Sequence, residues 1–380
     1  MTAPLEGPLG LYVHVPFCEA KCTYCHFAID PRRPGEDRQE RYLRVVLREM
    51  EQAEPGPSDT LYFGGGTPSL MSVDRLGHIV KAARSRFSLA PGAEVTVEAN
   101  PRDFDEAGYR SLLAVGANRL SLGVQSFDDG VLVEMGRHHT SADSVHAVEA
   151  ARAAGFGNVS LDLVLGWPGE TAERWRRALD ALASLAPEHV SLYVLEVDGK
   201  TVLTHRQKRG ALVLPDDDLV ADLYLETVEH LGAQGLARYE ISNFARAGFA
   251  SRHNRKYWDE SAFLGFGMAA HSFRGGRRFW NLDRFAPYCR AIEEGGTAVA
   301  GERLLGDRES AQEALFTGLR RAEGVDLAEY RRRHRLDPLV AWEQGLGEAE
   351  AAGLVEVDGQ RLRLTDRGVL VSNEVFQLFV

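Results

Sequence analysis

Three cysteines lie on one short loop and have the residue type and spacing for metal chemistry. They are Cys18, Cys22 and Cys25, in the pattern CxxxCxxC directly after an apolar, strand-like segment. Three thiolates on a tight loop can hold three irons of a four-iron cluster and leave the fourth iron open to a ligand. The spacing alone also allows a zinc site with His14 or His26 as the fourth ligand. The loop therefore predicts a metal or cluster centre.

Further candidate ligand-binding residues stand where other strand-like segments end. Glycines 64–66 and Thr67 follow one segment, Glu98 and Gln125 end two others, and Asp162 lies inside a fourth. Glycines let backbone N–H groups approach a carboxylate closely, although a tight turn also uses them. Glu98 and Asp162 could equally be satisfied structural residues, but an acid inside an apolar strand is costly to bury without a partner. Together these residues would suit a small zwitterionic ligand that carries a sugar.

Strand and helix signals alternate over the first two thirds of the chain. Strands are predicted over 11–15, 60–63, 94–98, 119–124, 159–164 and 190–195, and helices over 36–53, 72–87, 105–115, 141–154, 171–185 and 216–234. Such alternation predicts βαβ units and a parallel sheet. Because ligands bind at the carboxyl ends of parallel strands, the candidate residues should meet at one edge of that sheet.

The predicted fold class is α/β: a partial (β/α)6 TIM-like barrel with a small C-terminal helical, winged-helix-like domain. Residues 1–240 form the barrel with the cysteine loop, and 241–305 form a connecting segment, of which 242–300 read as less regular. Residues 306–380 carry helix signals and then alternation around Asp358-Gly359, a strong hairpin signal. A winged helix can bind DNA, but the acidic charge balance and the lack of a basic recognition face argue against it.

Composition limits the setting in which the protein works. The chain has 380 residues, of which 44% are hydrophobic, and a net charge of -11, which argues against nucleic-acid binding by bulk electrostatics. Three of its four cysteines lie within eight residues, a poor disulfide framework that favours a reducing, cytoplasmic setting. No apolar run approaches the roughly 20 residues that span a bilayer, and the N-terminus shows no secretory signal pattern.

The sequence resembles the radical S-adenosylmethionine superfamily through the cysteine loop and the run Gly64–Pro68. Within it, the chain is similar to the branch that holds oxygen-independent coproporphyrinogen oxidase and the HemW-type haem chaperones. Further matches are Tyr12–Cys18, Gly123–Ser126, Asp162–Gly169 and Tyr239–Phe244. The resemblance runs from about residue 10 to the end of the chain.

The resemblance implies a 4Fe-4S cluster on the three loop cysteines, with the amino and carboxylate groups of S-adenosylmethionine on the open iron. Gly65, Gly66 and Thr67 would hold the methionine end of that cofactor. The same resemblance implies cofactor contacts from Tyr12, Glu98, Gln125, Arg137 and Asp162. Arg137 suits the methionine carboxylate because a guanidinium makes strong charge-assisted bonds to it.

Two features separate the branches of this family. The oxidase branch has a fourth cysteine two residues after the third, where this chain has Phe27, and a longer extension than the 17 residues that precede Cys18. The chaperone branch has an HNxxYW motif, which is intact at 253–258. The resemblance therefore favours the HemW type. It implies haem as cargo, haem-acceptor proteins as partners, with respiratory haemoproteins among the candidates, and a role in porphyrin metabolism.

His253 of this motif is a candidate haem ligand, since imidazole is a common haem ligand. A His-Asn pair flanked by aromatics would equally serve to hold a loop by hydrogen bonds. His271 and Cys289 are other conceivable ligands.

The competing hypothesis is a radical enzyme that cleaves S-adenosylmethionine and acts on a porphyrin-like substrate, or a related radical methyltransferase. Whether the protein is an enzyme is left open, as is its oligomeric state. A peripheral contact with membrane partners is also open, although no anchor is visible.

Overall fold

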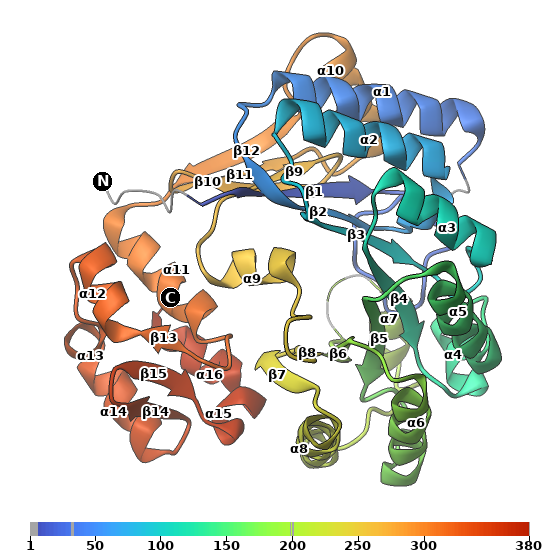
Figure 1. Ribbon diagram of the computed structural model, residues 1–380. Coiled ribbons are helices and arrows are strands. Elements are labelled where there is room, and N and C mark those ends of the chain that lie inside the picture. The colour runs from blue at the N-terminus through green and yellow to red at the C-terminus, as the bar shows by residue number, and fades with distance from the viewer. Residues whose placement is uncertain (1–6, 32–33, 198, 200, 380) are drawn as a thin grey trace.

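One large curved sheet dominates the computed structural model, which describes residues 7–31, 34–197, 199 and 201–379. Two predictions fall on residues outside these ranges: the domain limits at residues 1 and 380, and the lack of a secretory signal pattern at the N-terminus. The sheet has twelve strands in the order β12-β11-β10-β9-β1-β2-β3-β4-β5-β6-β8-β7 (Figure 1). Its central part is the six parallel strands β1 Leu9–Val15, β2 Ser58–Gly65, β3 Glu94–Ala99, β4 Arg119–Gln125, β5 Val159–Leu165 and β6 His189–Val194.

Helices between these strands cover the outer face of the sheet (Figure 1). They are α1 Glu36–Gln52, α2 Val73–Arg86, α3 Glu106–Val115, α5 Ser141–Ala154 and α6 Ala172–Leu185. Side chains of Asp105, Thr140 and Thr171 cap three of them at the N-terminus by accepting backbone N–H groups. The apolar faces of these helices and the sheet form the main core. The predicted βαβ units are therefore confirmed.

Two short helices lie beyond what the sequence pattern predicted: α4 Asp129–Met135 and α7 Val202–Lys208. Each has seven residues, about two turns, which is too short for a helical hydrophobic period to be seen. Helix α8 Asp217–Ala233 does fall where acidic residues before an apolar run predicted it.

The segment read as an irregular connection contributes much of the sheet. Four strands extend the sheet beyond β1: β9 Phe263–Phe266, β10 His271–Arg274, β11 Arg277–Asn281 and β12 Val299–Leu304. Two strands complete the opposite edge of the sheet: β7 Ala237–Glu240 and β8 Asn243–Ala245. Strand β9 pairs in parallel with β1, with Gly10 opposite Phe263. The interpretation of 242–300 as less regular was wrong, because these strands are short and glycine turns interrupt their alternation. The predicted domain limits stay a prediction.

The C-terminal part is a small helical unit with its own three-stranded sheet, β13-β15-β14 (Figure 1). Its hairpin pairs β14 Val355–Asp358 with β15 Arg361–Leu364 around the predicted turn. The remaining elements of this unit are α11 Asp307–Gly318, β13 Val325–Asp326, α12 Leu327–His334, α13 Pro338–Ala341, α14 Glu343–Ala351, α15 Asp366–Leu370 and α16 Ser372–Phe376. Among the described residues, no helix combines the length and the apolar character needed to cross a bilayer.

Glu49 of α1 joins the barrel to the strands added beyond β1. Its carboxylate accepts hydrogen bonds from the backbone N–H of Gly267 at 2.8 Å, the hydroxyl of Tyr288 at 2.6 Å and the amide of Asn281 at 2.5 Å. Burial raises the pKa of Glu49 to about 7, although these three hydrogen bonds act in the opposite direction. The carboxyl group therefore titrates near neutral pH in the folded protein.

The raised pKa predicts a measurable effect of pH on stability. A carboxyl whose pKa is higher in the folded than in the unfolded protein contributes stability below its unfolded pKa, and this contribution is lost as pH rises through its folded pKa. For the shift of Glu49, the loss in the free energy of unfolding is up to about 3 kcal/mol. We expect Glu49→Gln to remove this contribution. The free energy of unfolding, measured by urea denaturation, should then differ less between about pH 5 and about pH 8 in the variant than in the parent protein. Glu51→Gln, on the exposed side of the same helix, is the matched control, and equal pH profiles for Glu49→Gln and the parent would contradict the assignment.

Candidate functional site

Backbone hydrogen bonds fix the cysteine loop at its base and at its middle. The Asp30 N–H donates to the Pro16 carbonyl at 2.7 Å, and the Cys18 N–H donates to the Asp30 carbonyl at 3.4 Å. Farther along, the Thr23 N–H donates to the carbonyl of Met135, the last residue of α4, at 3.0 Å. The short helix that sequence reasoning missed therefore serves as an anchor for the loop.

The three loop cysteines are partly exposed free thiols. The Cys18 Sγ lies 3.6 Å from the Thr67 hydroxyl, and the Cys22 Sγ lies 3.6 Å from an Arg137 guanidinium N–H. Burial raises the pKa of the Cys18 thiol to about 11 and also raises the pKa of Cys25. Thiolates in this environment need a compensating positive charge, which a bound metal group supplies.

The cluster-binding role of the cysteines stays a prediction. Across the described parts of the chain, no three His, Cys, Asp or Glu side chains are placed where they could hold one metal ion. A four-iron cluster does not require the three thiolates to meet at one metal ion, because each thiolate binds a different iron.

The glycine run after β2 packs tightly against the start of the cysteine loop. The Thr67 N–H donates to the Phe17 carbonyl at 2.7 Å. A Cβ on Gly66 would lie 2.6 Å from that carbonyl oxygen, and one on Gly65, whose φ is 105°, would lie 2.6 Å from the His14 ring. Close approach within the fold therefore accounts for both glycines, and their contact with a cofactor stays a prediction.

Glu98 and Asp162 lie close together inside the barrel. The Tyr62 hydroxyl donates to Glu98 at 2.8 Å, and the Ser121 hydroxyl donates to Asp162 at 3.1 Å. Burial, and then the neighbouring Asp162, raise the pKa of Glu98 to about 7, and burial raises the pKa of Asp162 as well. A Glu98 carboxyl with this pKa can accept hydrogen bonds from hydroxyl groups when it is ionised and can donate one when it is protonated.

Arg137 lies beside Cys22 of the cysteine loop, and Gln125 is the last residue of β4. Arg137 donates to the Gly123 carbonyl at 2.9 Å and to the Asn100 side chain, yet its Nε is buried without a hydrogen-bond partner. Gln125 has a φ of 65° at an irregularity of β4, a conformation that costs energy in a residue with a side chain and often marks a functional site.

These features test whether the residues fit S-adenosylmethionine. A buried guanidinium N–H with no partner costs free energy that a ligand carboxylate would recover, and it lies beside Cys22, where the cluster would place the methionine end of the cofactor. Glu98 and Asp162 inside the barrel offer acceptors for ribose hydroxyls. The donor set therefore fits the cofactor, although the contacts of the individual residues stay predictions.

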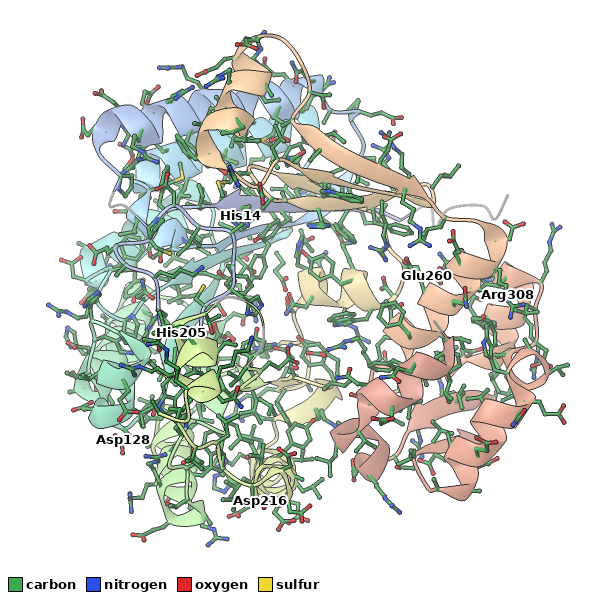
Figure 2. The ribbon with its side chains drawn as sticks, turned by 180° about the vertical axis from the view of Figure 1, so that it is seen from behind. His14, Asp128, His205, Asp216, Glu260 and Arg308 are labelled. Atoms are coloured by element: carbon green, nitrogen blue, oxygen red, sulfur yellow. The ribbon has the colours of Figure 1, made fainter. Side chains whose placement is uncertain are left out.

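Tyr12 of β1 faces the same interior from the opposite side. Its hydroxyl donates to the Nδ1 of His14 at 3.2 Å, and His14 in turn donates from Nε2 to the Ala28 carbonyl at 2.8 Å. Both nitrogens of His14 are therefore used within the protein, and burial lowers its pKa. The sequence left His14 open as a zinc ligand; in this structure its ring instead holds the cysteine loop against β1 (Figure 2).

A cavity of about 470 Å³ opens between the cysteine loop and the strands beyond β1. Aromatic rings and histidines make up most of its wall. The lining residues are Tyr12, His14, His26, Phe27, Ala28, Tyr257, Phe263, Ala269 and His271. Its volume falls within the range of sites that bind organic cofactors.

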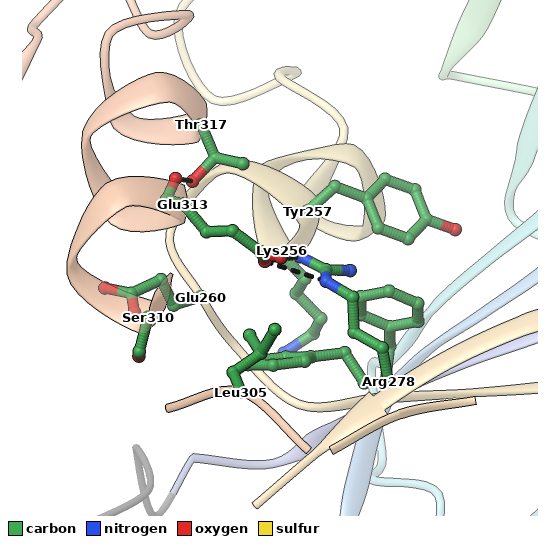
Figure 3. A pocket seen from close by; sticks show the side chains of 10 residues that line it. Lys256, Tyr257, Glu260, Arg278, Leu305, Ser310, Glu313 and Thr317 are labelled. Atoms are coloured by element: carbon green, nitrogen blue, oxygen red, sulfur yellow. Dashed lines mark hydrogen bonds and ion pairs between the residues drawn. The ribbon is translucent and has the colours of Figure 1, made fainter. Parts of the chain in front are cut away.

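A second, much smaller cavity is lined by residues of α9 Arg252–Trp258 and of α11, among them Tyr257 and Thr317 (Figure 3). Arg278 of β11 and Glu313 of α11 form an ion pair at its edge. Its volume is about 10 Å³, room for one water molecule at most. It is therefore part of the contact between the sheet and the C-terminal unit.

The predicted haem ligand His253 is buried, with 1% of its surface exposed. Its Nδ1 lies 2.8 Å from the Thr60 hydroxyl and its Nε2 lies 2.9 Å from the Tyr257 hydroxyl. Burial, and then Lys256, lower the pKa of His253 to about 3, so the ring is neutral. His253 does not line the large cavity, and its role as a haem ligand stays a prediction.

The rest of the HNxxYW motif ties α9 across the amino ends of the barrel strands. The Glu94 carboxylate at the start of β3 accepts the backbone N–H groups of Arg252 and His253 at 2.9 and 3.0 Å. Lys256 makes an ion pair with Asp59 at 2.9 Å. Such hydrogen bonds fit the alternative that the sequence left open, in which the motif holds a segment in place.

Sequence reasoning missed Arg119, which is fully buried at the start of β4. Its Nε and Nη1 have no hydrogen-bond partner. The signal in the sequence was a charged residue directly before an apolar strand. A charged residue at that position is ordinarily interpreted as the exposed end of the strand.

The packing of the glycine run predicts that Gly66→Ala disturbs the cysteine loop. The new Cβ would meet backbone atoms of residues 15–17, which cannot rotate away, so we expect a loss of about 1 to 3 kcal/mol in the free energy of unfolding. Gly157→Ala is the matched control, because a Cβ there would have no heavy atom within 4 Å. A thermal unfolding midpoint equal to that of the parent in Gly66→Ala would show that the close approach is absent.

Comparisons with known proteins agree with this geometry. A model of the Radical SAM superfamily matches residues 12–182, and one of the HemN C-terminal domain matches residues 305–371. Heme chaperone HemW of Mycobacterium tuberculosis (strain ATCC 25618 / H37Rv) is 38% identical, over 98% of this chain and 95% of the relative. Heme chaperone HemW of Bacillus subtilis (strain 168) is 35% identical, over 97% and 98%.

Among solved structures, coproporphyrinogen III oxidase (HemN) from Escherichia coli superposes with a TM-score of 0.83 at 24% identity, over 98% of this chain and 90% of that one. A likeness at this identity concerns the fold, and it confirms the predicted α/β barrel with a C-terminal domain. The near full-length identity of 35% and 38% to the two HemW proteins goes further, and the chain therefore belongs to the HemW family of the radical S-adenosylmethionine superfamily.

Proposed function

We propose that the protein is a haem chaperone, which binds haem and passes it to acceptor proteins while carrying a 4Fe-4S cluster and S-adenosylmethionine. The observation that carries the proposal is the cavity of about 470 Å³ against the cysteine loop, whose residues His26, Phe27 and Ala28 form one wall. Aromatic and apolar walls with a few imidazoles suit a flat, largely apolar macrocycle that contains iron. The HemW names of the relatives support the same assignment.

Cys18, Cys22 and Cys25 would hold the cluster, and the glycine run would lie beside the methionine end of S-adenosylmethionine. When bound, the cluster supplies redox chemistry and one iron open to an outside ligand. Arg137 would neutralise the cofactor carboxylate with its unpartnered Nε. Glu98, Asp162, Gln125 and Tyr12 would surround the rest of the cofactor inside the barrel.

We further propose that haem acceptors, respiratory haemoproteins among them, receive the cargo in the cytoplasm. The clustering of three of four cysteines on one metal-binding type of loop supports a reducing compartment. The division into a barrel over 1–240, a connection over 241–305 and a C-terminal unit over 306–380 is kept as part of this proposal.

The cluster assignment predicts the metal content of cysteine variants. After anaerobic reconstitution with iron and sulfide, we expect about four irons and four sulfides per chain in the parent and a marked loss in Cys18→Ser, Cys22→Ser and Cys25→Ser. Cys289→Ala is the matched control, because Cys289 is buried in α10 Phe285–Glu293, away from the loop. Full iron and sulfide content in the triple serine variant would remove the cluster from the proposal.

The chaperone role predicts binding and transfer without turnover. Haem titration under reducing, oxygen-free conditions should give a saturable complex, and mixing with an apo-haemoprotein should move the Soret spectrum to that of the acceptor. Addition of dithionite and S-adenosylmethionine should yield little sustained 5'-deoxyadenosine. Sustained 5'-deoxyadenosine together with a chemically altered tetrapyrrole would instead identify a radical enzyme acting on a porphyrin-like substrate.

A further inference from the structure

The large cavity contains three histidines that differ in what their nitrogens contact. His14 uses both ring nitrogens within the protein. Among the described residues, neither His26 nor His271 makes a side-chain hydrogen bond, and both are exposed. A haem iron needs an imidazole nitrogen with a free lone pair, so only these two lining histidines can bind iron without first breaking a hydrogen bond.

His271 is held in position for such a bond. It begins β10, and its ring stacks on Trp280 of the neighbouring strand β11, with centroids 6.0 Å apart and planes at 23°. Within the described residues, the one ring that pairs with His26 is that of its neighbour Phe27 on the cysteine loop. A ligand on a rigid strand loses less conformational freedom on binding than one on a loop, which favours His271.

The wall opposite His271 suits a flat aromatic cargo. Phe27 exposes 57% of its surface, a costly arrangement for a large apolar side chain unless something covers it. Phe263 and Tyr257 form a further wall, with their rings perpendicular and 4.7 Å apart. A macrocycle in the cavity would bury apolar surface of one face against Phe27 and would turn its other face, through which the iron accepts an axial ligand, toward β10.

His253 lies behind this wall. Its Nε2 is bonded to the hydroxyl of Tyr257, and its ring stacks on Tyr62 with centroids 5.2 Å apart. Ligation of iron by His253 would require breaking the bonds to Tyr257 and Thr60 and opening a buried contact. In this structure His253 therefore positions a wall of the cavity.

From this geometry we propose that His271 is an axial ligand of the haem iron, that the macrocycle lies in the cavity between β10 and the cysteine loop, and that His253 is a positioning residue. The inference rests on the proposed haem-binding function. It deepens that function by naming the binding surface and the bond that holds the metal.

The test is haem titration of the intact chain with variants that separate ligation from positioning. We expect His271→Ala to shift the Soret band and to weaken haem binding about tenfold or more, which corresponds to about 1.4 kcal/mol or more. The surface variant His146→Ala should keep the spectrum and the haem affinity of the parent. Added imidazole should restore the Soret position in His271→Gly, because the free ligand replaces the deleted ring.

His253 variants complete the test, with thermal unfolding measured to show that each protein is folded. His253→Ala should lower the unfolding midpoint and weaken haem binding while leaving the Soret position unchanged, and His253→Gln should recover part of the stability. A changed Soret band in His253→Ala or His26→Ala, with an unchanged one in His271→Ala, would overturn the inference. If the parent itself binds no haem, the proposed function fails, whichever residue lines the cavity.

Discussion

The site depends on backbone pairing between the start of the cysteine loop and the glycine run after β2. The N–H groups of Gly66 and Thr67 donate to the carbonyls of Val15 and Phe17, each at 2.7 Å, so two successive parallel strands stay joined beyond their ends. This pairing leaves no room for a Cβ at Gly66. The loop then runs toward α4 and Arg137, where the Thr23 N–H donates to the Met135 carbonyl and the Cys22 Sγ lies 3.6 Å from the Arg137 guanidinium.

Helix α9 makes the cavity and the C-terminal unit parts of one structure. Its N-terminus is held by Glu94 from the barrel, its Tyr257 forms a cavity wall, and its Trp258 lies under the guanidinium of Arg320 from the segment after α11, 4.5 Å from the ring centre. The loop that follows α9 adds the ion pair of Glu260 with Arg333, at 3.0 Å. His253, Tyr257 and Trp258 of the motif therefore contact the barrel, the cavity and the C-terminal unit. These contacts give the motif a structural role that does not require any of its residues to bind a metal.

The sequence was sufficient for the barrel because its strands and helices are long and their hydrophobic periods differ. Strands β9 to β12 could not be predicted, because each is short and its stability comes from pairing with β1 and with one another, which is a tertiary effect. The cysteine loop, Arg137 and the two acids were found from residue type, spacing and resemblance. The satisfied state of His253 could not be found, because a hydrogen bond between segments nearly 200 positions apart, such as Thr60 with His253, leaves no local pattern. The burial of Arg119 and the hydrogen bonds of His14 depend on tertiary packing, which residue type and spacing do not show.

The same contacts suggest how the cofactor end and the cavity are physically connected. Tyr12 lines the cavity, its ring lies 6.2 Å from that of Tyr62, and Tyr62 donates to Glu98 in the predicted cofactor site. Tyr62 also stacks on His253, which bonds Tyr257 in the cavity wall. Because these rings are closely packed, a change in the hydrogen bonding of Glu98 has to be accommodated by rings that border the cavity. Glu98 and the aromatic wall of the cavity therefore belong to one packed network.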